Sequence, residues 1–198
     1  MLLYDNTTSG NCYKVRLLLA HLGIACERRE LSVHDRSNRS ELLGALNPAL
    51  RVPTLMLDDG RPLAESNAIL WYFGDGTRYV PTDRYERAQV LQWQFFEQYD
   101  HEPSIAVARF MLHYRGGEID AAALADRQTR GYRALDAMEK HLAGREFLVG
   151  SRYSIADISL YAYTHVAGEG GFDLQRYPAI RAWLGRVAAQ PGHITIDA

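Results

Sequence analysis

The spacing of hydrophobic and polar residues changes several times within the first 75 positions, which predicts short strands alternating with helices. Leu2–Tyr4 is a short apolar run, and apolar residues then recur at helical spacing from Asn11 to Leu22, where Gly23 closes the helix. Asp58–Arg61 is a tight turn between two further strands. The predicted elements are strand 2–4, helix 11–22, strand 24–33, helix 37–46, strand 53–57, strand 62–64 and a helix from Ser66 through Phe73, with Ser37 and Ser66 as N-caps.

The pattern changes after a segment rich in glycine and proline at residues 76–82, which we interpret as a linker. Beyond it, strand patterns disappear and helical spacing predicts four helices, at 84–113, 119–142, 154–167 and 178–189. The βαβαββα order of the first part is that of the thioredoxin-like fold. We therefore expect an α/β thioredoxin-like domain at residues 1–75 and an all-helical domain at residues 83–198.

The third of these long helices begins with a capping box. Ser154 is followed three residues later by Asp157, so each side chain can bond the backbone of the other. Tyr153 and Ile158 are placed to form the accompanying hydrophobic staple. We therefore interpret Asp157 as a structural residue.

Composition excludes several classes of function. The net charge is −2, with acids and bases mixed along the chain, so we expect no nucleic-acid partner. Hydrophobic residues make up 47% without any long apolar run, and we expect no membrane association. The N-terminus lacks a signal-peptide pattern, and Cys12 and Cys26 form no disulfide framework, which favours the cytoplasm. The seven histidines show no metal-ligand spacing, so we expect no metal.

Two short motifs together indicate a specific ligand. Pro53 begins a strand, and a cis Val52–Pro53 bond would leave the backbone of Val52 available to pair with an extended ligand. Glu65 offers a carboxylate for an ammonium group, and Ser66 opens a helix whose N-terminus suits a carboxylate. A peptide with a zwitterionic end and a thiol fits this combination, and that molecule is glutathione.

These motifs, with the segment Ser9–Val15 and the capping box, resemble the cytosolic glutathione S-transferase superfamily, from Leu2 to about Pro191. Ser9–Val15 is most similar to bacterial members near the serine-type theta and zeta classes. The resemblance implies the two-domain fold of that family, glutathione as co-substrate, a small hydrophobic electrophile as second substrate, and a homodimer.

The resemblance also implies roles for individual residues. Ser9 would donate its hydroxyl to the glutathione thiolate, and Asn11 competes for that role because an amide also donates. Val52, Pro53, Glu65 and Ser66 would bind the tripeptide. Arg51 would pair with the glycyl carboxylate, although a solvated loop charge is the alternative.

The second domain would supply the electrophile pocket. Tyr99, Glu102 and Phe110 recur at helical spacing on one face and would line it, with core packing as the alternative. Pro103 within this helix predicts a kink.

Other functions stay open at this point. Ser9-x-x-Cys12 resembles a redox Cys-x-x-Cys frame with its first cysteine replaced, so a glutaredoxin-like thiol transferase with a redox role for Cys12 is one alternative. Glutathione-dependent isomerase or peroxidase activity would use the same thiolate. A non-enzymatic module that serves protein assembly is a further alternative.

Overall fold

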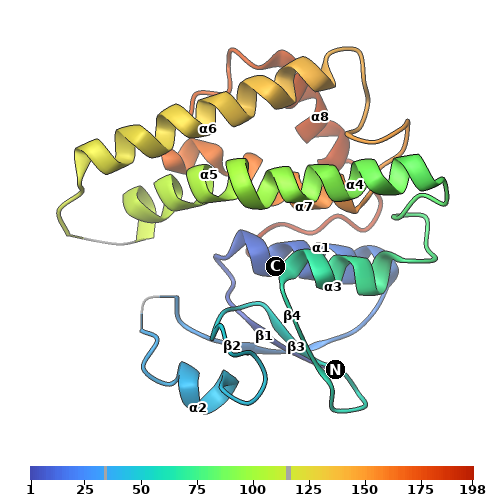
Figure 1. The fold of residues 1–198 in the computed structure, drawn as a ribbon, viewed down its shortest axis with the longest axis vertical. Coiled ribbons are helices and arrows are strands. Elements are labelled where there is room, and N and C mark those ends of the chain that lie inside the picture. The colour runs from blue at the N-terminus through green and yellow to red at the C-terminus, as the bar shows by residue number, and fades with distance from the viewer. Residues whose placement is uncertain (34, 115–116) are drawn as a thin grey trace. The chain divides into compact units, whose positions relative to one another are not determined.

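The computed structural model describes residues 1–33, 35–114 and 117–198. The chain divides into two compact units (Figure 1). Unit 1 comprises Met1–Thr77 and Pro191–Ala198, and unit 2 comprises Arg78–Gln190. The domain limits of 1–75 and 83–198 stay a prediction. In the structure, residues 191–198 make their contacts within unit 1.

Unit 1 is built on a four-stranded sheet in the order β2-β1-β3-β4. β1 pairs in parallel with β2, while β1 with β3 and β3 with β4 are antiparallel. Chain order is β1, α1, β2, α2, β3, β4, α3, which confirms the predicted thioredoxin-like arrangement. The bounds are β1 Leu2–Asp5, α1 Gly10–Leu22, β2 Glu27–Glu30, α2 Arg39–Leu43, β3 Thr54–Met56, β4 Pro62–Ala64 and α3 Ser66–Gly74.

The two faces of this sheet carry different cores. Leu3 and Tyr4 are consecutive in β1, so their side chains point to opposite faces. Leu3 belongs to a buried cluster with residues of α1 and α3, whereas Tyr4 packs with Leu31 and with Leu43 of α2. Figure 1 accordingly shows α1 and α3 on one side of the strands and α2 on the other.

Three predicted boundaries in unit 1 were wrong. β2 is four exposed residues rather than 24–33, because it is an edge strand that pairs only with the four residues of β1. Ser37 does not cap α2, since its N–H donates to the Asp35 carboxylate at 2.9 Å and Asn38 precedes the helix. Glu65 holds the N-cap position of α3, and Ser66 is the first helical residue.

Unit 2 is helical, and the segment predicted as a helix at 84–113 is helical throughout, from Arg84 to Tyr114, with two π-helical stretches within it. A π-helical turn, η1, separates α4 from α5 just before Pro103, which has no N–H to donate to the preceding turn. The Ser104 hydroxyl donates to the Asp100 carbonyl at 2.8 Å. The bounds are α4 Arg84–Phe96, η1 Glu97–His101, α5 Glu102–Arg109, η2 Phe110–Tyr114, α6 Ala121–Leu142, α7 Ile155–Thr164, η3 Ala167–Gly170 and α8 Pro178–Ala188.

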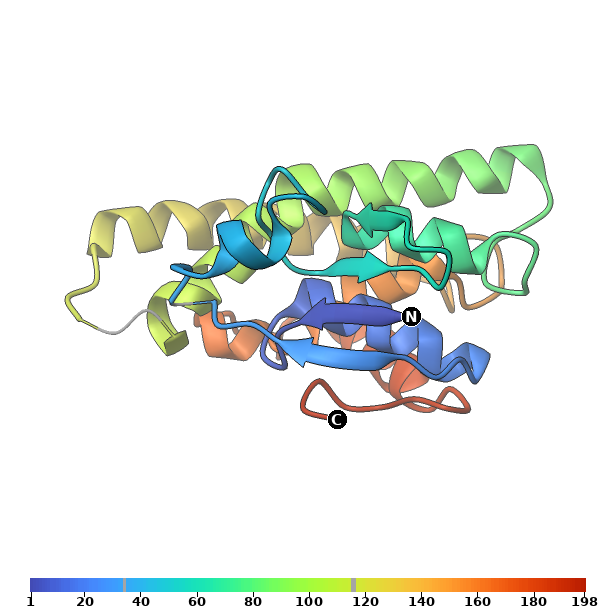
Figure 2. The same cartoon turned by 90° about the horizontal axis from the view of Figure 1, so that it is seen from below.

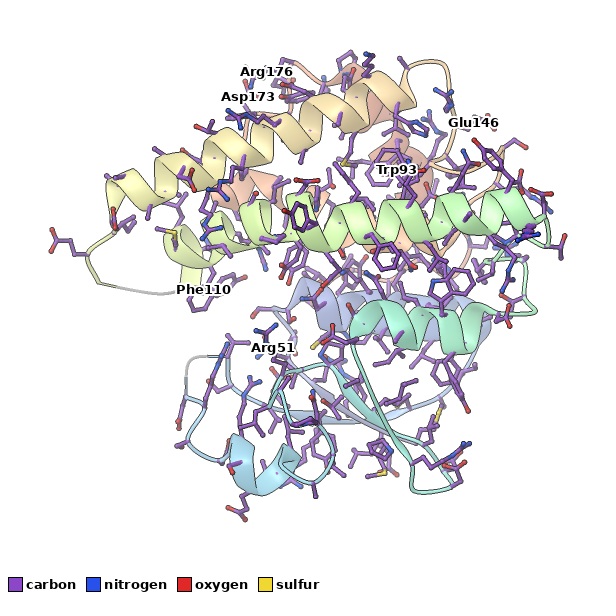
Figure 3. The ribbon with its side chains drawn as sticks, viewed as in Figure 1. Arg51, Trp93, Phe110, Glu146, Asp173 and Arg176 are labelled. Carbon is purple, nitrogen blue, oxygen red and sulfur yellow. The ribbon has the colours of Figure 1, made fainter. Side chains whose placement is uncertain are left out.

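The core of unit 2 is organised around α7, whose ten residues are all buried. The capping box at its start is confirmed, and Asp157 is fully buried within it. Trp93 of α4 packs against His141 of α6, with ring centroids 4.6 Å apart, and Figure 3 shows it between these two helices. These contacts tie α4 to α6.

Residues 1–33, 35–114 and 117–198 lack two features. No helix there is long and apolar enough to cross a membrane. The same residues contain no group of three His, Cys, Asp or Glu side chains placed to hold a metal ion.

Candidate functional site

The first part of the candidate site is the N-terminus of α1. Ser9 has extended backbone angles, φ −78° and ψ 120°, and its Oγ accepts the N–H of Cys12 at 3.3 Å. This is an N-cap, in which the hydroxyl oxygen serves as acceptor. The hydroxyl proton can still be donated in another direction. Ser9 can therefore cap α1 and donate to an anion at the positive end of the helix dipole.

The loop that carries Ser9 is held by two charged residues that the sequence analysis missed. The Glu30 carboxylate accepts the Thr7 N–H at 2.9 Å and the Asn6 amide at 3.0 Å. Arg16, which is 5% exposed, donates to the Thr7 carbonyl at 2.9 Å. Because one charge lies on β2 and the other on α1, the loop is fixed from both elements.

The same arginine fixes the final residues of the chain. Arg16 donates to the carbonyls of Ile196 at 2.7 Å and Ala198 at 3.1 Å. The Tyr13 hydroxyl donates to the Ile194 carbonyl at 2.7 Å, and Arg28 donates to the Ala198 carbonyl at 2.8 Å. Figure 2 shows this last segment running alongside β2. Residues 191–198 thus brace α1 and the edge of the sheet.

The second part of the site is the N-terminus of α3. Glu65 is exposed and has φ 67°, a left-handed conformation that is strained for a residue with a Cβ and is found mostly at functional sites. The next residue, Ser66, is 4% exposed, and its hydroxyl donates to Asn11 Oδ1 at 3.4 Å. The N-termini of α1 and α3 therefore meet, and two helix ends that favour anions lie side by side.

The third part is the loop before β3. The predicted cis Val52–Pro53 bond is confirmed. Pairing with β1 starts at Thr54, so Val52 lies beyond the last paired residue. Asn47, which is 4% exposed, donates from Nδ2 to the Arg51 carbonyl at 3.1 Å and to Thr54 Oγ1 at 3.0 Å. Asn47 therefore fixes the loop conformation, a role that was not recognised from the sequence.

The side chain of Arg51 is exposed on this loop. Arg51 lies on the loop that leads from α2 to β3, where Figure 3 labels it. An exposed guanidinium there is compatible with both interpretations of Arg51, a contact with a ligand carboxylate and a solvated charge.

Cys12 does not have the environment of an exposed nucleophile. It is 0% exposed, and burial together with the negative charge of Asp5 raises the pKa of its thiol well above the ordinary value. A reactive cysteine needs a lowered pKa and access to its partner. The structure therefore argues against the redox role considered for Cys12.

The three residues expected at the electrophile pocket lie apart along unit 2. Tyr99 is 85% exposed and lines a cavity of about 660 Å³ between α4, α5 and α6. Glu102 and Phe110 are half-buried and are not among the described residues that line this cavity. Phe110 opens η2 at the far end of α5 (Figure 3). The structure does not bring the three into this one cavity, and their role stays a prediction.

A thioredoxin-like unit followed by a helical unit of this kind is the fold of the glutathione transferases. Family models of the glutathione S-transferase N-terminal and C-terminal domains match residues 8–75 and 93–191. The chain belongs to the glutathione S-transferase family.

Individual relatives agree with this assignment. A solved glutathione S-transferase from Pseudomonas fluorescens Pf-5 is 50% identical, with a TM-score of 0.94 and 98% of each chain covered. Glutathione S-transferase 2 of Anopheles gambiae is 30% identical over 93% of this chain and 88% of its own. The disulfide-bond oxidoreductase YfcG of Escherichia coli is 29% identical over 74% of this chain and 71% of its own.

Proposed function

We propose that this protein is a glutathione transferase in which unit 1 binds glutathione and holds its sulfur as a thiolate for attack on a hydrophobic electrophile. The observation that carries the proposal is the meeting of two helix N-termini, with Ser66 Oγ 3.4 Å from Asn11 Oδ1 and Ser9 at the start of α1. Such an arrangement favours two anionic groups of one ligand, a carboxylate and a thiolate.

Each part of glutathione has a group in unit 1 that suits it. Ser66 and its backbone amide would bind the γ-glutamyl carboxylate, and the exposed carboxylate of Glu65 would bind the ammonium group. The backbone of Val52, which precedes the first paired residue of β3, would pair with the cysteinyl backbone. Pro53 sets the turn at this point, and Arg51 would bind the glycyl carboxylate.

The energy required for thiol activation is modest. A free thiol has a pKa of about 8.5, so only a few per cent is ionised at neutral pH. Lowering the pKa by about 2 units needs about 2.7 kcal/mol of preferential stabilisation of the thiolate. Donor hydrogen bonds from Ser9 and Asn11, added to the end of the α1 dipole, are of the right size.

In unit 2 we propose that Tyr99, Glu102 and Phe110 contribute contacts to the electrophile. The half-buried Phe110 ring and the exposed Tyr99 ring offer apolar surface for such a substrate. Glu102 would act at the polar margin of that surface.

We further propose that the protein is a homodimer, which the exposed face of α4 supports. Leu91 and Phe95 lie four residues apart on α4 and are 39% and 69% exposed. A row of large apolar side chains along one helical face is typical of an interface. We also propose a cytoplasmic location, which the two unpaired cysteines support.

A second candidate activity is glutathione-dependent disulfide exchange, which the similarity to YfcG favours. In this chain it would use the activated glutathione thiolate rather than Cys12, because Cys12 is fully buried. Such an enzyme would keep its activity in Cys12→Ala and lose it in variants of the residues that activate glutathione.

The test is to measure glutathione binding by calorimetry and then titrate the ultraviolet thiolate absorbance of the bound tripeptide. Wild type, Ser9→Ala, Asn11→Ala and Cys12→Ala should be compared, with turnover of an aryl halide and of a small organic disulfide. We expect Ser9→Ala to raise the bound thiol pKa by about 1 unit, which corresponds to about 1.4 kcal/mol. Lack of glutathione binding by the wild type would refute the proposal. Loss of activity in Cys12→Ala alone would replace it with the glutaredoxin-like mechanism in which Cys12 itself reacts.

A further inference from the structure

The residue behind the candidate site that needs an explanation is Lys14. The chain contains two lysines against twenty arginines, and Lys140 is exposed on α6 whereas Lys14 is 0% exposed. Burying an ammonium group is unfavourable unless hydrogen bonds compensate for the lost water. Lys14 Nζ donates to Asn11 Oδ1 at 2.8 Å and to Ser66 Oγ at 3.4 Å. The buried charge is therefore directed at the two residues where the helix N-termini meet.

The chemistry of the ammonium group fixes the orientation of the Asn11 amide. An ammonium group has three donors and no acceptor, so the atom of Asn11 that faces it must be the carbonyl oxygen and not the NH₂ group. The Ser66 hydroxyl approaches the same oxygen at 3.4 Å, which reinforces this orientation. Because Oδ1 and Nδ2 are separate substituents of the planar amide carbon, placing Oδ1 on Lys14 directs Nδ2 elsewhere.

This orientation determines what Asn11 can do for a thiolate. The NH₂ group donates hydrogen bonds and would stabilise a negatively charged sulfur, whereas the carbonyl oxygen would repel it. Asn11 is half-buried and lies in the first turn of α1, two residues after Ser9. An amide free to flip would present the wrong atom part of the time.

We propose that Lys14 is a positioning residue that holds the Asn11 amide with Nδ2 toward the glutathione sulfur, so that Ser9 and Asn11 donate together. This inference rests on the proposed glutathione site. In this role Lys14 acts on the sulfur through Asn11 and not by direct contact. Its contact with Ser66 also links the residue proposed for the γ-glutamyl carboxylate to the residue proposed for the thiolate.

The test is a double-mutant cycle on the pKa of bound glutathione, read from its thiolate absorbance, together with kcat and KM for an aryl halide. The variants are Lys14→Met, Asn11→Ala and the combination of both, with Lys140→Met as the control that removes an exposed lysine. We expect Lys14→Met to raise the bound thiol pKa by about 0.5 to 1 unit, a threefold to tenfold smaller fraction of thiolate. In the Asn11→Ala background the same change should have no further effect, and Lys140→Met should behave like the wild type.

Lys14→Gln provides a second, less disruptive variant. Its amide can still donate to Asn11 Oδ1 without a charge, so we expect a bound thiol pKa close to that of the wild type. Glutathione affinity, measured by calorimetry on every variant, separates loss of the ligand from loss of activation. A purely structural role would reduce affinity or stability without moving the thiol pKa.

The outcomes distinguish this inference from the proposed function. If the wild type takes up no glutathione, both are refuted. If it binds glutathione but Lys14→Met leaves the bound thiol pKa unchanged, only the role of Lys14 is refuted. The role of Lys14 would also be refuted if Lys14→Met shifted the bound thiol pKa equally in the wild-type and Asn11→Ala backgrounds. Lys14 would then act on the sulfur directly through its charge.

Discussion

The buried carboxylate of Asp157 allows a quantitative test of how unit 2 is stabilised. Oδ1 accepts the Leu148 N–H and the Trp183 indole N–H, each at 2.9 Å, and Oδ2 accepts the Ser154 N–H at 2.9 Å and its hydroxyl at 3.1 Å. Asp157→Ala removes all four acceptor contacts and leaves buried donors unpaired. Each unpaired donor costs about 1–3 kcal/mol, with partial compensation between neighbours. We expect Asp157→Ala to lower the free energy of unfolding by about 3–5 kcal/mol.

The isosteric variant Asp157→Asn should lose only part of the unfolding free energy that Asp157→Ala loses. In Asp157→Asn the amide oxygen can still accept from Leu148 and Trp183, but the NH₂ group would face the donors of Ser154. We therefore expect a smaller loss of about 1–2 kcal/mol, close to that of a lost N-cap. Urea denaturation followed by circular dichroism measures both variants, and each kcal/mol corresponds to a shift of about 2–4 °C in Tm for a protein of this size.

The matched control is Asp126→Ala on α6. Asp126 is an exposed acid that pairs with Arg130 at 3.1 Å in an i,i+4 arrangement. Such a pair contributes about 0.3–0.5 kcal/mol. If Asp157→Ala were no more destabilising than this control, the assignment of Asp157 as the structural centre of the capping box would be refuted.

Asp157 also predicts a dependence of stability on pH. Burial, only partly offset by the donors around it, raises the pKa of this carboxyl from 3.8 to about 6. Since the folded state holds the proton more tightly than the unfolded state, this contribution is fully present below about pH 4 and is lost as the pH rises through 6. We expect the stability advantage of wild type over Asp157→Asn to shrink between pH 4.5 and pH 7. An advantage that grew over this range would contradict the raised pKa.

Two further predictions concern surfaces and thiols. Burial raises the pKa of both thiols, but Cys12 is 0% exposed whereas Cys26 is only half-buried. An aromatic disulfide reagent should therefore label Cys26 in the native protein and Cys12 only after unfolding. Rapid labelling of native Cys26→Ser would contradict this prediction. Phe95→Glu should convert the proposed dimer to a monomer in light scattering, because it places a charge beside Leu91 on the apolar face of α4. Tyr85→Glu on the same helix tests whether any exposed aromatic residue has this effect, and a dimer that persists in Phe95→Glu would exclude this face as the interface.

Local signals explain why the fold could be predicted from the sequence. Gly23 ends α1 in a left-handed conformation with φ 65°, as a helix-closing glycine does. Gly60, with φ 81°, forms the turn between β3 and β4. Each signal acts over only a few residues, so the element order followed from them. The bounds of β2 and the π-helical stretches within the helical segment 84–114 did not, because pairing length and π-turns depend on neighbours distant in sequence.

The candidate site divides in the same way. Ser9 and Ser66 were recognisable because each stands next to a helix start, and the structure places both at the expected N-termini. Glu30, Arg16 and Lys14 were not recognised, because their roles come from contacts between separate elements. Arg16 and Ile196, for example, are 180 residues apart in sequence yet share a hydrogen bond of 2.7 Å. A charged residue with such distant partners has no local pattern by which to identify it.

Ser9 shows why a structural and a catalytic role need not exclude each other. In the structure its oxygen accepts the Cys12 N–H, which is the ordinary behaviour of an N-cap serine. That contact uses a lone pair and leaves the proton for a second partner, and it fixes the oxygen at the end of α1. Because the cap restrains the side chain before any ligand arrives, a thiolate at that helix end would meet a donor already in place. The cap would therefore support thiol activation, and the same argument applies to Asn11, whose oxygen is occupied so that its NH₂ group can serve the sulfur.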